Sequence, residues 1–191
     1  MSLKPVISVI GGGSWATALI KILSNNVDTI HWWVRTTDTA DFINKYRHNP
    51  NYLSDVEINL SKVKISNDMK KSISSSDIII LAVPSAFFKS ALGDIKPENF
   101  KNKTVFSAIK GIIPDDLLII GDYLREKLEI PLNKIGVITG PCHAEEVAME
   151  RLSYLTIAST DLNTANTLAS LMNCRYIKTS EIGRASCRER V

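Results

Sequence analysis

The sequence has few cysteines, and the three present, Cys142, Cys174 and Cys187, show neither paired nor metal-type spacing. An odd number of isolated cysteines argues against a disulfide framework and indicates a reducing compartment. We therefore expect a cytoplasmic protein without a metal site.

A long apolar run and a strong excess of charge are also lacking. No stretch approaches the ~18 apolar residues of a membrane span, and the N-terminus shows no basic region followed by an apolar run. The net charge of +3, from 23 basic and 20 acidic residues, is too small to indicate nucleic acid or a membrane surface as a partner. It suits a phosphorylated small-molecule ligand.

Apolar, β-branched segments alternate with segments of helical periodicity along the chain. With 191 residues, 45% of them hydrophobic, the chain is long enough for one domain with a large core. Because this alternation is typical of βαβ units, we predict an α/β fold, a Rossmann-like, doubly wound, mostly parallel sheet flanked by helices. Strands are expected at 5–10, 29–34, 63–65, 77–83, 104–108, 135–138, 153–158 and 175–177, and helices at 14–23, 37–46, 68–73, 114–128, 142–149 and 163–172.

Two segments depart from this alternation. Residues 47–62 are polar and irregular, and their length suggests a binding loop. Residues 181–191 contain three arginines and no apolar periodicity. We expect a domain at 1–180 followed by a tail that is either solvated native sequence or not native at all.

A glycine-rich turn, GGGSWA (11–16), separates the first expected strand from the first expected helix and fits the pattern G-x-G-x-x-A. Gly11 permits a tight turn, Gly13 lets the backbone approach a pyrophosphate, and Ala16 keeps the helix close to the sheet. The amides at the helix start then face the anion. Three glycines alone can also form a plain turn, so the prediction of NAD or NADP binding depends on the flanking strand and helix.

Two residues near this turn have both a functional and a structural interpretation. Trp15 can line the cofactor or pack as a core aromatic of the helix. Arg35 stands at the end of the second expected strand, where enzymes that prefer NAD have an acidic residue. A guanidinium there can pair with a 2′-phosphate, which favours NADP or tolerance of both cofactors; the alternative is a plain surface arginine.

Three later loops, at 83–87, 108–111 and 139–145, are expected at the carboxyl edge of the sheet, where ligands bind in open parallel sheets. Lys110 follows an apolar strand in the second of these loops. Its ammonium can stabilise the negative charge that develops when a carbonyl is reduced. Without further context, an ordinary surface lysine is the slightly better interpretation.

The third loop contains further candidates. Gly140 and Pro141 are expected to open a helix whose amides hold a substrate oxygen. His143 is a candidate proton shuttle, although a histidine at a helix start is more often a surface group. Cys142 shows no sign of activation, so we reject a thiol mechanism.

Five segments together resemble the NAD(P)-dependent glycerol-3-phosphate dehydrogenase family in order and spacing. They are GGGSWATAL (11–19), NPNYL (49–53), DIIILAVPSAF (77–87), SAIKGI (107–112) and GPCHAEEVA (140–148). The family usually has glycine in place of Ala16 and serine in place of Cys142, and we interpret both small replacements as tolerated.

The resemblance implies reversible reduction of dihydroxyacetone phosphate to sn-glycerol 3-phosphate, which feeds glycerophospholipid synthesis. It implies Lys110 as the catalytic residue and NADP or NAD as the cofactor. Besides Gly11 and Gly13, the implied cofactor contacts are Ser14, Trp15, Arg35, Tyr52, Phe87, Lys110 and Ala144. The implied substrate contacts are Lys110, Gly140 and Cys142.

The resemblance also implies a second, all-helical domain that carries a general-acid lysine and binds the substrate phosphate. That domain is expected to begin just after Ser180, and no segment here matches it. We therefore expect a truncated chain that binds cofactor with little or no turnover. Apolar surface left exposed is expected to favour self-association, for example as a homodimer.

Two alternatives stay open. Another two-domain dehydrogenase, of the 3-hydroxyacyl-CoA or ketopantoate type, is not expected to combine SAIKG with GP-x-x-A. A non-catalytic dinucleotide sensor has no need of the charge of Lys110. Assays of a full-length protein with each carbonyl substrate separate these alternatives.

Overall fold

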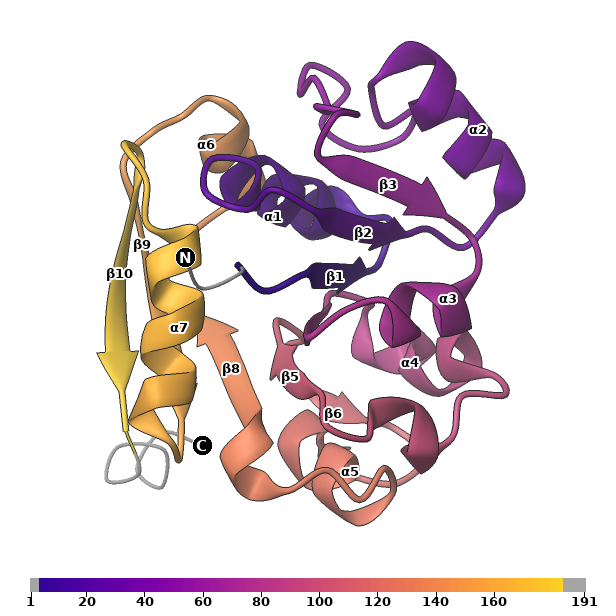
Figure 1. The fold of residues 1–191 in the computed structure, drawn as a ribbon, viewed down its shortest axis with the longest axis vertical. Coiled ribbons are helices and arrows are strands. Elements are labelled where there is room, and N and C mark those ends of the chain that lie inside the picture. Colours follow the sequence, from indigo (N-terminus) through magenta and orange to yellow (C-terminus); the bar gives the residue numbers. More distant parts are fainter. Residues whose placement is uncertain (1–3, 184–191) are drawn as a thin grey trace.

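Helices pack against both faces of one large sheet in the computed structural model, which describes residues 4–183 (Figure 1). Within these residues the sheet has eight strands in the order β10-β9-β8-β5-β4-β1-β2-β3. Neighbouring strands run parallel, except that β8 and β9 are antiparallel. The predicted Rossmann-like, mostly parallel α/β fold is confirmed. The strands are β1 (Ile7–Ile10), β2 (Ile30–Trp33), β3 (Val63–Ser66), β4 (Ile78–Leu81), β5 (Thr104–Ser107), β8 (Ile135–Thr139), β9 (Ser153–Ser159) and β10 (Ile177–Ile182).

Alternate residues of the central strands are buried in two separate cores, one on each face of the sheet. In β4, Ile80 packs into one core, whereas Ile79 and Leu81 pack into the other. Burial on both faces explains why this strand is apolar throughout. The first core contains residues of α1 (Ser14–Leu23), α2 (Thr37–Tyr46), α6 (Ala144–Ala148) and α7 (Leu162–Met172); the second contains residues of α3 (Met69–Ser74), α4 (Ser85–Leu92) and α5 (Ile120–Glu126).

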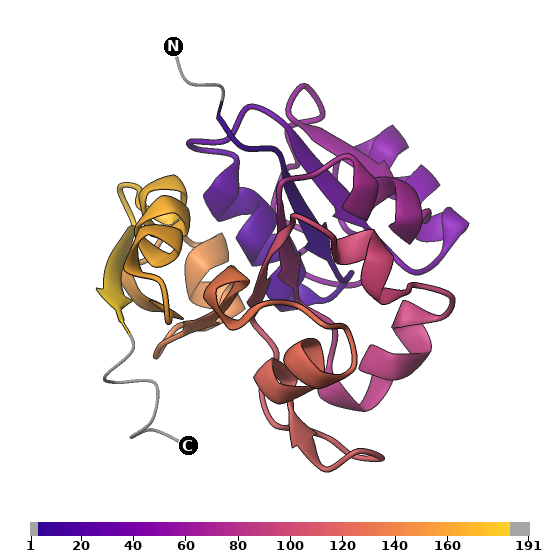
Figure 2. The same ribbon diagram turned by 60° about the horizontal axis from the view of Figure 1, so that its bottom comes forward.

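Different helices and strands lie at the two ends of the sheet. Figures 1 and 2 place α7 and β10 together at one end of the molecule, and α2 and β3 at the other. The central strands β1, β4 and β5 therefore lie between them, as the strand order requires. No helix within residues 4–183 is both long enough and apolar enough to cross a membrane.

The ends of α1 and α2 agree with the sequence prediction, and capping residues mark both ends of α2. Thr36 precedes α2, and its hydroxyl oxygen accepts a hydrogen bond from the backbone N–H of Thr39. Arg47 follows α2 in the left-handed conformation, with φ of 62°. A capping hydroxyl at the start and a left-handed residue at the end are ordinary helix boundaries.

The helix predicted at 114–128 is wrong in its first half. Pro114 lies between the two strands of a small antiparallel hairpin, β6 (Ile112–Ile113) and β7 (Leu118–Ile119), and α5 begins only after them. Leu117 has φ of 52°, which is incompatible with a continuous right-handed helix. A proline followed by an aspartate suits the start of a turn as well as the start of a helix, which explains the error.

Two further differences concern α4 and the last strand. The segment at 83–87 was expected to be a loop, but α4 begins at Ser85, directly after Pro84. The last strand was expected at 175–177, whereas β10 runs from Ile177 to Ile182 and so enters the segment expected to be a tail. The rest of that tail, 184–191, lies outside the described residues.

Candidate functional site

The glycine turn joins β1 to α1 at the carboxyl edge of the sheet. Gly11 has φ of 144°, and a Cβ there would lie 2.5 Å from the carbonyl oxygen of Ala82, just after β4. Only glycine allows this approach without strain. The turn thus lies between β1 and β4, where the strand order reverses and where ligands bind in this type of sheet.

The start of α1 offers both the space and the donors that a diphosphate needs. Gly13 precedes the helix with extended backbone, and no atom lies within 4 Å of the position that a Cβ would occupy. The first turn of α1 contains no acidic residue, and no side chain caps it. Its backbone amides are therefore available to an anion, and a dinucleotide fits the residues present.

A cleft of about 270 Å³ opens beside the start of α1. It is formed by α1, the loop after β5, the loop after β8 and α6, which are far apart in the sequence. The structure therefore brings most of the predicted cofactor and substrate contacts into one place. The predicted site residues that line the cleft are Ser14, Trp15, Lys110, Gly140, Cys142 and Ala144.

Lys110 reaches the cleft from a short connection whose backbone is held in place. The Ser107 hydroxyl accepts a hydrogen bond from the Ile109 N–H at 3.1 Å, and the Ala108 N–H donates to the carbonyl of Leu81 at 2.9 Å. Within residues 4–183 Lys110 takes part in no ion pair. The backbone that leads to Lys110 is thus held in place, and its ammonium is left available for an anionic ligand.

Trp15 lies between the core and the cleft. Its side chain is partly buried and packs against the core on the α1 face, and it also lines the cleft. The indole is therefore held by the core while one part of it remains open to a ligand.

The segment at 140–145 differs from its prediction. Gly140 and Pro141 do not open a helix, because α6 begins only at Ala144. The Glu146 carboxylate accepts a hydrogen bond from the His143 N–H at 3.4 Å, so negative charge already stands at the start of this short helix. A substrate oxygen held by its amides therefore receives no support from the structure.

Gly140 has a clear packing role. Its φ is 136°, and a Cβ there would lie 2.6 Å from the carbonyl oxygen of Tyr154 on β9. Glycine is therefore required for the close approach of the loop to β9, in addition to any contact with a substrate.

Cys142 lines the cleft and is partly buried. Burial raises the pKa of the Cys142 thiol, Glu146 adds to this effect, and the charge of Lys110 opposes it. A raised pKa lowers the thiolate fraction at neutral pH, which is unfavourable for a nucleophile.

Arg35, Tyr52 and Phe87 do not line the cleft. Arg35 is exposed two residues after the end of β2, beside the start of α2. The side chains of Tyr52, in the loop at 47–62, and Phe87, on α4, are 48% and 58% exposed. Their roles as cofactor contacts stay predictions.

Asn49 is a site residue that the sequence analysis missed. It lies in the loop at 47–62 and is fully buried. Its side-chain oxygen accepts hydrogen bonds from the N–H groups of Asn51 and Tyr52, and its side-chain nitrogen donates to the carbonyl of Gly12. The only signal in the sequence was its place in the NPNYL segment, which does not show what the side chain contacts.

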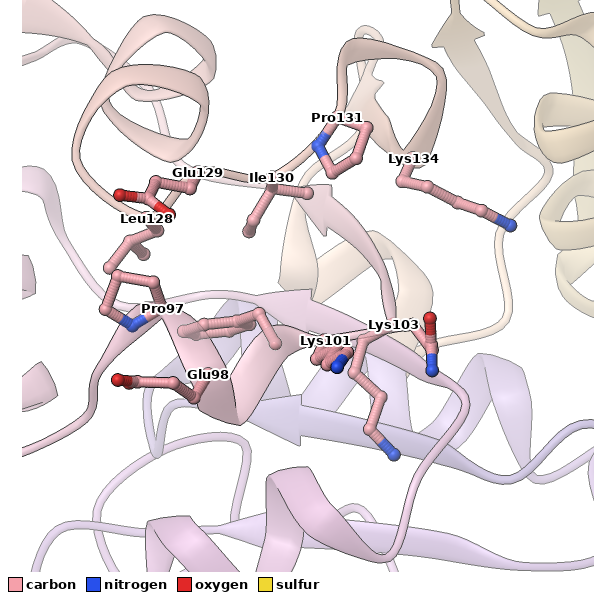
Figure 3. Close-up of a pocket in the computed structure, with 11 residues that line it drawn as sticks. Pro97, Glu98, Lys101, Lys103, Leu128, Glu129, Ile130, Pro131 and Lys134 are labelled. Carbon is pink, nitrogen blue, oxygen red and sulfur yellow. The ribbon is translucent and has the colours of Figure 1, made fainter.

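A larger cavity, of about 480 Å³, lies at the opposite edge of the sheet, before β5 and β8 (Figure 3). Glu98 and Glu129 lie toward one end of it, whereas Lys103 and Lys134 lie toward the other. None of the predicted site residues lines it. Because ligands of open parallel sheets bind at the carboxyl edge, the smaller cleft is the better candidate.

A glycine turn between the first strand and the first helix of a doubly wound sheet defines a class, the Rossmann-like dinucleotide-binding domains. Comparison with known proteins then identifies the family. Residues 6–165 match the profile described as the NAD-dependent glycerol-3-phosphate dehydrogenase N-terminus. The chain belongs to this family, and the resemblance inferred from its motifs is confirmed.

Individual relatives agree with this assignment. The glycerol-3-phosphate dehydrogenase (NAD(P)+) of Syntrophotalea carbinolica is 33% identical over 173 residues, which are 90% of this chain and 52% of that protein. The enzyme of the same name from Bacillus subtilis is 33% identical over 166 residues, which are 86% of this chain and 48% of that protein. The chain thus spans about half the length of the curated relatives it matches.

A solved structure shows the same fold. The crystal structure of glycerol-3-phosphate dehydrogenase from Coxiella burnetii matches with a TM-score of 0.83 at 24% sequence identity. The match covers 94% of this chain and 54% of that one. At this level of identity the likeness supports the fold alone.

Proposed function

We propose that this chain is the cofactor-binding half of a glycerol-3-phosphate dehydrogenase, which reduces dihydroxyacetone phosphate to sn-glycerol 3-phosphate with NADPH or NADH. The product would supply glycerophospholipid synthesis. In this proposal the dinucleotide-binding domain includes strand β10 and therefore extends at least to Ile182. One observation carries it: in a chain of this family, the start of α1 and Lys110 line the same cleft.

The glycine turn and α1 hold the pyrophosphate in this proposal. Gly13 leaves room for the phosphates, and the amides at the start of α1 donate to them. Trp15 and Ala144 contact the cofactor where they line the cleft, and Tyr52 and Phe87 contact it outside the cleft. Arg35 meets the adenosine ribose, where its guanidinium can pair with a 2′-phosphate.

Lys110 supports the chemical step by its charge. The nicotinamide, when bound, supplies the hydride that reduces the C2 carbonyl of the substrate. Lys110 then stabilises the negative charge that develops on the carbonyl oxygen, a contribution of about 3 kcal/mol for a preorganised donor. Gly140 and Cys142 line the substrate side of the cleft, and the proton comes from a general acid outside this domain.

A dinucleotide sensor is the second candidate function. A sensor needs the glycine turn, but it does not need the charge of Lys110 in the same cleft. The family assignment also favours the dehydrogenase. A complete enzyme that binds dinucleotide but reduces no carbonyl substrate would favour the sensor.

Calorimetric titration of the purified 191-residue chain with NADPH and with NADH tests the proposal. We expect one dinucleotide to bind per chain, and little or no oxidation of NADPH when dihydroxyacetone phosphate is added. Binding of neither dinucleotide to the folded chain would overturn the proposal, as would turnover at the rate of a complete enzyme.

Self-association as a homodimer is a further part of the proposal. Leu117 in the hairpin of β6 and β7 is 75% exposed, and Ile112 and Ile119 of the same hairpin are also exposed. Exposed apolar side chains of this kind favour association. Sedimentation velocity should show a dimer that dissociates when Leu117 is replaced by serine; a monomer at all concentrations contradicts this part alone.

A further inference from the structure

We propose that Trp32, Asn49 and Thr17 are positioning residues that fix the peptide orientations of the glycine turn, an inference that rests on the proposed dinucleotide binding. Each glycine carbonyl of the turn accepts a hydrogen bond from one of these side chains. Trp32 Nε1 donates to Gly11 at 2.7 Å, Asn49 Nδ2 to Gly12 at 3.0 Å, and Thr17 Oγ1 to Gly13 at 3.1 Å.

The three positioning residues are all fully buried. A buried polar side chain that has its partners is costly to displace, because the partner would be left unsatisfied. The carbonyls of Gly11 and Gly12 are therefore held toward the protein interior by buried side chains. The carbonyl of Gly13 accepts from the Thr17 hydroxyl and also from the Thr17 backbone N–H, at 3.0 Å.

A fixed carbonyl also fixes the next N–H group. The peptide bond is planar and trans, so the N–H of the following residue points away from the carbonyl oxygen. The three bonds thus direct the N–H groups of Gly12, Gly13 and Ser14 away from the interior. Within residues 4–183 none of these N–H groups has a hydrogen-bond acceptor, so the turn presents a set of preoriented donors to an anion.

Asn49 and Thr17 form one connected network. Besides its bond to Gly12, Asn49 Nδ2 donates to Thr17 Oγ1 at 2.9 Å, and this hydroxyl in turn donates to Gly13. The amide orientation of Asn49 is settled by its oxygen, which accepts from the N–H groups of Asn51 and Tyr52 at 3.0 and 3.3 Å. Asn49 therefore ties the loop that carries Tyr52 to the pyrophosphate turn.

The network predicts a particular pattern of variants. Thr17→Val removes the hydroxyl at constant shape, whereas Thr17→Ser retains it. Asn49→Asp removes the two donated bonds but keeps an oxygen acceptor for the loop. Trp32→Phe removes the donor to Gly11 and keeps an aromatic ring.

Calorimetric titration with NADH and with ADP, which keeps the diphosphate, tests the inference. For Thr17→Val, Asn49→Asp and Trp32→Phe we expect the affinity for both ligands to fall by about tenfold, as when oriented donors to a charged group are lost. Thr17→Ser should bind as the wild type does. Circular dichroism shows which variants are folded, and only the affinities of folded variants are compared with that of the wild type.

A matched control separates positioning from a general loss of stability. Ser159 is buried, and its hydroxyl donates to the carbonyl of Ile135 at 2.9 Å, between β9 and β8 and away from the turn. Ser159→Ala should lower the melting temperature as Thr17→Val does, without weakening ADP binding. Equal weakening by Ser159→Ala would overturn the inference.

The two proposals fail in different ways. If the folded wild-type chain binds neither NADH nor ADP, the proposed function fails. If the wild type binds both, and folded Thr17→Val binds them equally well, only the positioning inference fails.

Discussion

Ser14 and Lys110 line the same cleft, although Ser14 begins helix α1 and Lys110 follows strand β5. Both contribute positive electrostatic potential, the first through the helix dipole and the second through its ammonium. Two ligands that each carry negative charge, such as a dinucleotide and a phosphorylated substrate, are therefore favoured over neutral molecules.

The charge of Lys110 should matter more for the reaction than for cofactor binding. In the complete enzyme we expect Lys110→Met to lower kcat by about 100-fold, because a preorganised charge on the developing oxyanion is lost. The dissociation constant for NADPH, measured by fluorescence, should change by less than about threefold, because the pyrophosphate is held mainly by backbone amides. Lys101→Met is the matched control: Lys101 lines the cavity at the opposite edge. An unchanged kcat in Lys110→Met contradicts this role.

The two glycines of the turn should respond differently to a methyl group. Gly13→Ala adds it to open space, so we expect a change of less than about 1 kcal/mol in the free energy of unfolding. The methyl group occupies the place of the phosphates, and dinucleotide affinity should fall at least about tenfold, or ~1.4 kcal/mol. Gly11→Ala forces a contact with Ala82 at a positive φ and should cost about 2 kcal/mol or more of stability.

Gly121→Ala is the control for this pair. A Cβ at Gly121, within α5, also meets no atom within 4 Å. Chemical denaturation should show an unchanged or slightly raised stability, and titration an unchanged affinity. Tight dinucleotide binding by Gly13→Ala would show that the phosphates lie elsewhere.

Arg35 should decide between the two dinucleotides. Arg35→Gln removes the guanidinium that can pair with a 2′-phosphate, so the affinity for NADPH should fall about tenfold, while that for NADH changes little. Arg125→Gln is the control, because Arg125 lies on α5 and pairs with Asp122 and Glu126. Parallel titrations with both dinucleotides measure the ratio of the two affinities. Equal losses for NADPH and NADH would argue against a contact with the 2′-phosphate.

Cys142 should behave as a weakly reactive thiol. In a Cys174→Ser, Cys187→Ser background, its alkylation by iodoacetamide can be followed against pH. Because burial raises the pKa of the Cys142 thiol, the rate should reach half its maximum at a higher pH than for an exposed cysteine. Cys142→Ser should keep its dinucleotide affinity. Fast alkylation of Cys142 at neutral pH would contradict a raised pKa of its thiol.

Local signals explain why much of the fold was predictable. Strand β4 is apolar throughout because both of its faces are buried, which made it recognisable in the sequence. The glycine turn was recognisable because strand, turn and helix follow one another directly. Pro114 misled the prediction because proline suits both a helix start and a turn.

The missed features depend on contacts between distant segments. An apolar alternation does not show the direction of a strand, so the antiparallel pairing of β9 with β8 was not foreseen. Asn49 was overlooked for the same reason, since its importance comes from hydrogen bonds to Gly12 and Thr17, more than 30 residues away. Lys110 was expected at the sheet edge that also holds the glycine turn, and the structure places it in one cleft with Ser14.

Amide mapping by NMR tests the central claim most directly. When NADPH is added to the 15N-labelled chain, the largest shifts should fall on the backbone N–H groups of Gly12, Gly13 and Ser14, followed by Lys110, while Lys101 at the opposite edge stays unchanged. Shifts centred on Lys101 and Lys134, or no shifts at saturating NADPH and NADH, would contradict the account.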